Sequence, residues 1–508
     1  MALLSFYSVA PVVAESDSRE KARHLLNRIA YGPRPGDIDR VLKKGIGSYI
    51  EEQLQPNSIP EPAALRSLVE KSAALTNTPA QLFMNFGKQP LMQAAGLKGK
   101  KQDNSPEARQ ARANVQKQIR QNYMTMYGQI TDAKLMRAVY SPRQLEEVMT
   151  EFWFNHFNVS FDKGLDHLWV GTYEEQAIRP YVLGNFRQLL GATAHHAAML
   201  FYLDNWQNTS DKPVVNRGGR KRKRKGKFKG INENYARELM ELHTLGVDGG
   251  YSQADVISLA RILTGHGLQN RRVPQRAGGG LNNRSGYYFD QNRHDFSDKQ
   301  FLGHTIKGSG KQEINQALDI LAAHPSTARH ISFKLAQYFV ADKPPASLVN
   351  KLSSKFTSSG GNIRAVLQVL FSSPEFWKGD VRNAKYKTPY RYVVSSLRAT
   401  DAIVKRSRPI VGFLQIQGMP LYKCLTPDGY KYTEEAWLSP SGLLQRIEFA
   451  TALGAGRHPA ARIRNTNLVQ LKDIAGLEPT GSTARVIDQS HERLKNALVL
   501  GSPEFMKY

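Results

Sequence analysis

The stretch Asn-Glu-Asn-Tyr-Ala-Arg-Glu-Leu-Met-Glu-Leu-His-Thr-Leu-Gly, residues 232 to 246, combines the helical patterning typical of this chain with its densest set of chemically useful side chains. Its apolar residues recur with the period of an α-helix, which predicts one helix of about four turns. Gly246 is a suitable C-terminal stop. The projection places His243 on the apolar face and Glu238 and Glu241 on the opposite face.

Two interpretations of this helix remain open. A histidine in an apolar stripe is more often a hydrogen-bonded core residue than a ligand. Asn234 with Glu238, and Arg237 with Glu241, are i,i+4 pairs of the kind found on an ordinary surface helix. If the helix is instead buried on both faces, its carboxylates must be paired, liganded or catalytic.

The length and composition are those of a globular protein. The chain has 508 residues, of which 41% are hydrophobic, enough for one large core or a few domains. No apolar run approaches the roughly twenty residues needed to cross a bilayer, so we expect no transmembrane segment. The single cysteine, Cys424, excludes an intramolecular disulfide and a multi-cysteine metal site.

The chain is strongly basic, with 70 Lys and Arg against 44 Asp and Glu and a formal charge of +26. This balance predicts attraction to an anionic polymer such as an acidic polysaccharide or a nucleic acid. Nine basic residues and no acidic one lie between Arg217 and Lys229, which predicts a flexible basic linker or insertion at residues 211–230. Nucleic acid is the less favoured partner, because Phe228 is the only aromatic residue in this run and no recognised reading motif accompanies the charge.

The N-terminus resembles a secretion signal. Residues 1–14 contain an apolar stretch that ends in small residues, which suits cleavage before Glu15. A basic start is missing, so an apolar lead-in is the alternative interpretation. We expect export to the periplasm or the extracellular space.

Helical periodicity recurs along most of the chain. We therefore predict a mainly α fold, a multi-helix globular array with long ordered loops. One short β-ribbon is expected, formed by residues 287–289 and 301–306. The helical parts are residues 16–210 and 231–508, which form either two units or one continuous domain.

Further candidate residues lie outside the 232–246 helix. A helix that ends near residue 157 carries Trp153, Asn155 and His156, and it either packs in the core or lines an aromatic cleft. The other candidates are Asp204 and Trp206 near a helix end, and His294 with Asp295 between the predicted strands.

Several motifs together resemble a known family. They are Leu25–Arg28 with Tyr31–Pro33, Phe152–Phe157, Asn232–Gly246, Leu263–Gly265, His294-Asp295 with Phe301–Gly303, His324–Ala328, Lys334-Leu335, Phe339–Asp342, Pro427–Tyr430 and Trp437–Pro440. In this order they resemble the bacterial family called domain of unknown function 1800, over nearly the whole chain. The resemblance implies a mainly helical, usually exported protein without a settled activity. It also implies a sulfatase-like protein as a candidate partner, because genes for such proteins often neighbour those of the family. The chain departs from the family at His266, where tryptophan is usual.

The chemistry of these residues favours an enzyme over a binding protein, and both remain open. As an enzyme, the chain would be a hydrolase or lyase that acts on an extracellular, acidic carbohydrate polymer with one protonated and one ionised carboxylate. The predicted catalytic residues are Glu238, Glu241, His243, His156 and Asp204. The predicted substrate-binding residues are Asn155, Asn234, Arg237, Trp153, Trp206, His294 and Asp295. A divalent metal is a candidate cofactor if His156, His243 and His294 converge, although the sequence has no His-Glu-x-x-His zinc signature. The alternative is a non-enzymatic envelope protein that binds an anionic polymer or a protein partner.

Overall fold

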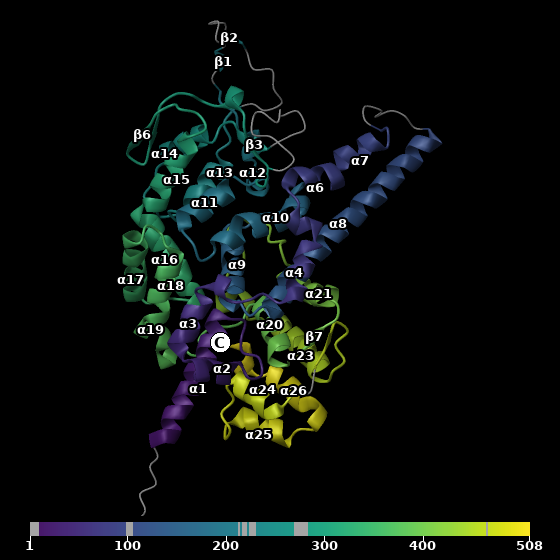
Figure 1. The fold of residues 1–508 in the computed structure, drawn as a ribbon, viewed down its shortest axis with the longest axis vertical. Coiled ribbons are helices and arrows are strands. Elements are labelled where there is room, and N and C mark those ends of the chain that lie inside the picture. The colour runs from purple at the N-terminus through teal and green to yellow at the C-terminus, as the bar shows by residue number, and fades with distance from the viewer. Residues whose placement is uncertain are drawn as a thin grey trace, which may run out of the picture.

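The computed structural model describes residues 10–97, 105–211, 214–215, 221–222, 230–268, 283–463 and 466–508. Helices dominate these residues and pack around one large core, so the prediction of a mainly α array is confirmed (Figure 1). In the first part the helices are α1 (Ala10–Ile29), α2 (Asp37–Lys44), α3 (Ile46–Gln53), α4 (Ala63–Glu70), α5 (Ala73–Thr76), α6 (Pro79–Phe86), α7 (Lys88–Ala94), α8 (Pro106–Tyr140), α9 (Gln144–His156), α10 (Asp166–Tyr173), the π-helical segment η2 (Glu174–Ile178), α11 (Phe186–Ala194), α12 (Ala197–Tyr202) and α13 (Asn234–Glu241).

The helices of the second part follow the same alternation of helix and short connection. They are α14 (Gln253–Ile262), α15 (Glu313–Ala323), α16 (Pro325–Phe339), α17 (Ala346–Ser358), α18 (Ile363–Ser372), α19 (Pro374–Trp377), α20 (Pro389–Ala399), α21 (Arg408–Ile416), α22 (Glu434–Trp437), α23 (Pro440–Gly454), α24 (Leu468–Ala475), α25 (Ser482–Gln489), α26 (Glu492–Leu500) and α27 (Pro503–Met506). Short 3₁₀ turns are η1 (Pro56–Ser58), η3 (Arg179–Tyr181), η4 (Asn205–Gln207), η6 (Gln291–Arg293) and η7 (Gly379–Val381).

Helix α9 lies at the centre of the molecule (Figure 1). All of its residues except Glu146 are buried, and α1, α3, α8 and η2 pack against it. Protein therefore covers this helix on nearly all sides, and its buried polar residues include Glu147, Glu151 and Asn155. Two interpretations of this helix were open, packing in the core and lining an aromatic cleft, and the structure favours packing in the core.

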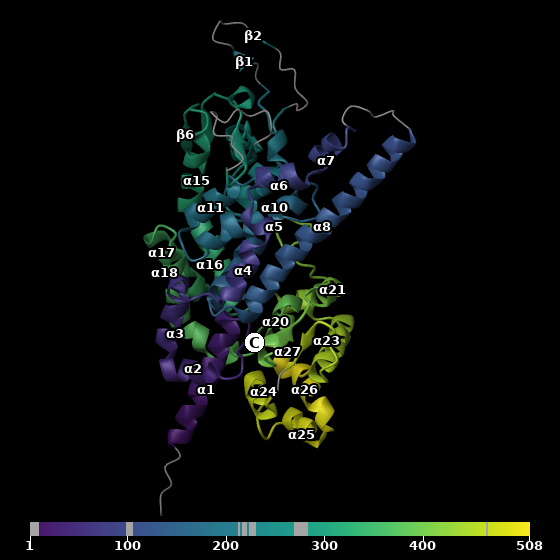
Figure 2. The same cartoon turned by 45° about the vertical axis from the view of Figure 1, so that its right-hand side comes forward.

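Helix α8 begins at a Ser105 cap, whose hydroxyl oxygen accepts from the Ala108 backbone N–H at 3.2 Å. Its C-terminal half packs in the core, whereas its N-terminal half projects from the body together with α7 (Figures 1 and 2). A small separate cluster of Leu97, Ala108 and Val115 covers the inner side of this projection.

The main core draws on both predicted helical parts, from Ala22 in α1 to Met506 in α27. Arg391 in α20 donates to the carbonyl oxygens of Asn27 and Ala30, each at 2.8 Å, and so joins α20 to the end of α1. These contacts join the two predicted helical parts.

The predicted strands pair differently from the expectation of one ribbon. β4 (Tyr287–Phe289) pairs with β3 (His266–Leu268), and β5 (Lys299–Phe301) pairs with β6 (His304–Ile306), both antiparallel. The predicted strand over residues 301–306 is a hairpin, because Leu302 and Gly303 both have positive φ and form a two-residue turn. The single-ribbon prediction was therefore wrong. The remaining pairs are β1 (Val214–Val215) with β2 (Lys221–Arg222), and β7 (Ile403–Val404) with β8 (Ala461–Arg462).

Two predicted segments fall largely outside the described residues. Of the basic segment 211–230, the structure describes only residues 211, 214–215, 221–222 and 230. Of the predicted signal segment 1–14, it describes only Ala10–Ala14, which begin α1. Within the described ranges, no helix combines the length and the apolar character that a membrane span requires.

Candidate functional site

Helix α13 is amphipathic as predicted, but it ends at Glu241 rather than Gly246. Its end is a wide turn, in which the backbone N–H of His243 donates to the Glu238 carbonyl oxygen at 3.1 Å. The Thr244 hydroxyl donates to the Leu239 carbonyl oxygen at 2.6 Å and closes the turn. Glu238 and Glu241 are half-buried and lie on the side away from the core, so burial on both faces does not occur.

Two of the predicted histidines meet in the core. The His156 Nε2 donates to the His243 carbonyl oxygen at 3.1 Å, and the two ring centroids are 6.2 Å apart. His330 of α16 lies on the other side of His156, again with 6.2 Å between ring centroids. Burial lowers the pKa of His156 well below its usual value, that of His243 to about 3 and that of His330 to about 4. The three imidazoles are therefore neutral at pH 7.

The third predicted histidine belongs to a separate buried network. The His294 Nε2 donates to Glu313 Oε1 at 2.9 Å, and Lys299 Nζ donates to Glu313 Oε2 at 2.5 Å. The Asp295 carboxylate accepts the backbone N–H and the hydroxyl of Ser297, at 2.8 and 2.6 Å. Glu313 pairs with the Lys299 ammonium in the core, so removal of either partner would leave an uncompensated buried charge.

The described residues do not support the predicted metal. No group of three or more His, Cys, Asp or Glu side chains in those ranges is arranged to hold an ion. His294 does not join His156 and His243, and the half-buried Lys334 adds positive charge beside the three imidazoles.

Asn155 and Trp153 have structural partners. Trp153 is fully buried, and its Nε1 donates to the Val182 carbonyl oxygen at 3.1 Å. The Asn155 side chain donates to the carbonyl oxygen of Tyr430 and accepts from its backbone N–H, each at 2.7 Å. These two bonds fix residues 417–433, the covering loop, on α9.

A second contact fixes the covering loop on α8. The Lys423 ammonium lies 4.5 Å from the ring centroid of Tyr127 and 3.2 Å from Asp162 Oδ1. A cation over an aromatic face and beside a carboxylate is held by both. Beneath the loop, a cavity of about 30 Å³ has room for one or two water molecules next to Glu151, whose pKa is raised by burial.

The remaining predicted residues lie at the surface around η4 and α13. Asp204 Oδ2 accepts from Lys163 Nζ at 3.1 Å, and Asn234 Nδ2 donates to the Leu203 carbonyl oxygen at 3.2 Å. Trp206 is half-buried and stacks on Phe201, with ring centroids 5.5 Å apart. Arg237 forms the predicted i,i+4 ion pair with Glu241 at 3.4 Å, and a second one with Glu233 at 3.3 Å.

The covering loop brings a second carboxylate, Asp428, into the electrostatic neighbourhood of Glu238. Partial burial raises the pKa of Glu238, and the negative charges of Glu241 and Asp428 raise it further. Partial burial acts in the same direction on Asp428, but hydrogen bonds from Lys431, 2.6 Å away, and Thr426 outweigh it and lower the pKa of Asp428. The pKa of Glu238 is thus raised, whereas that of its neighbour Asp428 is lowered.

Lys334 of α16 completes this surface cluster. Burial lowers the pKa of Lys334 to about 8, the positive charge of Lys431 lowers it further, and Asp428 opposes the shift. Glu238, Asp428 and Lys334 come from three segments far apart in the sequence, and together we call them the acid cluster. Groups with shifted pKa values that converge from separate elements are typical of functional sites.

The chain matches the family model described as protein of unknown function (DUF1800) over residues 24–507. It belongs to this family. No curated protein and no solved structure matches it.

The motifs that resemble DUF1800 proteins meet at this site. The 152–157 motif forms the end of α9, and the 232–246 motif contains α13. The 427–430 motif is hydrogen-bonded to α9 through Tyr430 and is an electrostatic neighbour of α13 through Asp428. Of the three residues of the acid cluster, Glu238 was predicted as a site residue, and Asp428 and Lys334 were not. Asp428 lies in the quoted motif 427–430 and Lys334 in the motif 334–335, and these motifs were the sequence signal by which both could have been found.

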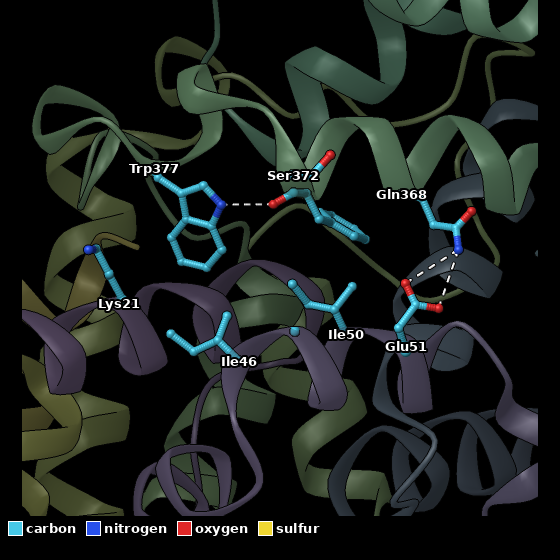
Figure 3. Close-up of a pocket in the computed structure, with 9 residues that line it drawn as sticks. Lys21, Ile46, Ile50, Glu51, Gln368, Ser372 and Trp377 are labelled. Carbon is cyan, nitrogen blue, oxygen red and sulfur yellow. Dashed lines mark hydrogen bonds between the residues drawn. The ribbon is translucent and has the colours of Figure 1, made fainter.

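A groove of about 440 Å³ lies between α1 and α3 on one side and α18 and α19 on the other (Figure 3). The Trp377 indole forms part of one wall and donates to the Phe371 carbonyl oxygen at 2.8 Å. Gln368 and Glu51 bridge the two walls at 3.3 Å. None of the DUF1800 motifs quoted above contributes a lining residue, so this groove serves below as a reference surface.

Proposed function

We propose that this DUF1800 protein is an exported hydrolase that cleaves an extracellular, acidic carbohydrate polymer at the acid cluster. The observation that carries the proposal is the convergence of Glu238, Asp428 and Lys334 from three separate segments, with the pKa values of the two acids displaced in opposite directions. Glycosidic cleavage needs one carboxyl group that still holds a proton and one that has lost it.

In the proposed reaction, Glu238 gives its proton to the glycosidic oxygen as the bond to the anomeric carbon breaks. Asp428 takes a proton from the water molecule whose oxygen bonds to that carbon. Glu241 keeps the pKa of Glu238 high through its charge. The excess of positive charge, +26 for the chain, attracts an acidic polymer to the surface.

His156 and His243 have no part in this reaction, because they are buried and neutral. The hydrogen bond between them holds the turn that ends α13 against the core. Asp204 pairs with Lys163 and likewise has no assigned chemical step.

The test is product release from a panel of acidic polysaccharides by Glu238→Gln and Asp428→Asn. Each variant should lose about 10²- to 10⁴-fold in turnover, the usual contribution of a positioned acid or base. Glu448→Gln is the control, because Glu448 is exposed on α23 and should tolerate the change. New reducing ends without unsaturated products would indicate hydrolysis, whereas unsaturated products would indicate a lyase. Full turnover in both variants would refute the proposal.

The pH profile gives a second test. A general acid works only while protonated, so turnover should fall as the pH rises through the pKa of Glu238, which lies above the usual glutamate value. Glu238→Gln should remove this alkaline decline from the residual activity. If the alkaline decline is unchanged in Glu238→Gln, a group other than Glu238 causes it.

A non-enzymatic protein that binds an anionic polymer is the second candidate. It is favoured by the structural hydrogen bonds of Asn155, Trp153, His294 and Asp295, which were predicted to bind substrate. For a binding protein, Glu238→Gln would leave polymer affinity intact. That affinity would fall smoothly with salt for many polyanions.

A further inference from the structure

A groove of about 440 Å³ lies between the residues that follow α13 and the facing sides of α16 and α17. Its lining includes Gly246, Asp248, Arg329, His330 and Phe333. The volume falls in the range of small-ligand sites, and the lining mixes apolar groups with a few charged ones.

The floor of the groove depends on a close contact between Gly246 and His330. A Cβ added to Gly246 would lie 3.0 Å from His330 Nδ1, and the residue has φ +84°. A hydrogen bond fixes the His330 imidazole, because its Nε2 donates to the Leu242 carbonyl oxygen at 3.3 Å. The low pKa of His330, about 4, leaves this floor uncharged at pH 7.

One wall of the groove contains the aromatic ring of Phe333 and the guanidinium of Arg329. Phe333 is 41% exposed, although phenylalanine is usually buried. The C–H face of a sugar ring can pack on such a ring, because aromatic faces carry partial negative charge. Arg329 is exposed, and its Nη1 donates to Asn350 Oδ1 at 3.1 Å. A guanidinium held in this way binds carboxylates in a defined orientation.

Helix α16 connects the groove to the acid cluster. His330 in the groove floor and Lys334 in the cluster are four residues apart, so they lie on the same side of the helix about one turn, ~5.4 Å, from each other. Lys334 in turn is an electrostatic neighbour of Asp428. A chain of sugar units along α16 would therefore contact both the groove and the acids.

We infer that this groove binds a hexuronate unit of the polymer, with the sugar ring on Phe333 and its carboxylate on Arg329, next to the unit that is cleaved. The inference rests on the proposed function and specifies its substrate class as a uronate-containing polysaccharide.

The experiment is equilibrium binding to the full chain carrying Glu238→Gln, which separates binding from turnover. The probes are tetramers of galacturonate, glucuronate and mannuronate, with a neutral galactose tetramer for comparison. At least one uronate tetramer should bind about ten-fold or more tightly than the neutral one. Arg329→Gln should remove that difference, because it removes a charge-assisted hydrogen bond. Phe333→Ala should weaken binding of both kinds of tetramer.

The matched control is Trp377→Ala in the groove of Figure 3, which should leave every affinity unchanged. The inference is overturned if no uronate tetramer binds, if Arg329→Gln and Phe333→Ala bind like the parent, or if Trp377→Ala causes the loss instead. If Arg329→Gln has no effect while Glu238→Gln abolishes turnover, only the groove assignment fails. If Glu238→Gln retains turnover, the proposed function fails.

Discussion

Replacing Gly429 by alanine tests how the covering loop holds Asp428 near Glu238. Gly429 has φ +70°, and a Cβ at this position would lie 2.3 Å from the carbonyl oxygen and 2.6 Å from Oδ1 of Asn155. No real contact is that short, so the loop must move away from α9. Both hydrogen bonds between Asn155 and Tyr430 would then be lost.

The expected loss of stability follows from these two effects. A left-handed backbone conformation costs about 1–2 kcal/mol for a residue with a Cβ. Each lost hydrogen bond adds about 0.5–1.5 kcal/mol. Gly429→Ala should therefore lower the free energy of unfolding by about 2–5 kcal/mol. Gly418→Ala in the same loop should lower it by about 1–2 kcal/mol only, because Gly418 has φ +78° but open space around the added Cβ.

Urea unfolding of both variants measures this difference, and turnover of the folded proteins measures its effect on the site. Gly429→Ala should lose turnover through displacement of Asp428, whereas Gly418→Ala should keep it. Equal stability of the two variants would show that the clash with Asn155 is relieved without moving the loop. Normal turnover in a destabilised Gly429→Ala protein would show that turnover does not depend on the position of Asp428.

Two further predictions concern the core. Glu313→Ala leaves the Lys299 ammonium and the His294 imidazole without their buried carboxylate, so it should lower the free energy of unfolding by about 3–5 kcal/mol. The surface control Glu492→Ala, which removes an exposed partner of Lys495, should lower it by less than about 1 kcal/mol. Equal urea midpoints for the two variants would contradict the structural role of the network. The pKa of His243 is about 3 in the folded protein against a usual 6.5, so the unfolded chain binds a proton first as the pH falls, and stability should decline from about pH 6.5 downward. His243→Leu should therefore make the urea midpoints less dependent on pH in this range. An unchanged pH dependence would show that the residue is already protonated in the fold.

The helices could be predicted from the sequence because their apolar period is local. The same period placed His156 and His243 on buried faces, and buried faces of neighbouring helices meet. The hairpin at Leu302-Gly303 was missed because residues 301–306 were assigned as one strand, although Gly303 could have indicated a turn.

The acid cluster could be predicted only in part. Glu238 was selected because it lies on a conspicuous helix, but Asp428 lies in a loop without periodicity, 190 residues further along the chain. Only the fold brings these carboxylates together. Glu313 was missed for a related reason, since a glutamate at the start of a helix is usually a solvated residue in the first turn.

The bonds from Arg391 to the end of α1 also bear on how the chain is made. They join residues 364 and 361 positions apart. A ribosome that adds about 5–20 residues per second needs roughly 20–70 seconds to travel that far. Throughout this interval the nascent first helix lacks the Arg391 guanidinium that pairs with its final carbonyl groups, although α2 and α9, which pack against it, are made before α20. The joint between the beginning of the chain and α20 can therefore close only after residue 391 has been added.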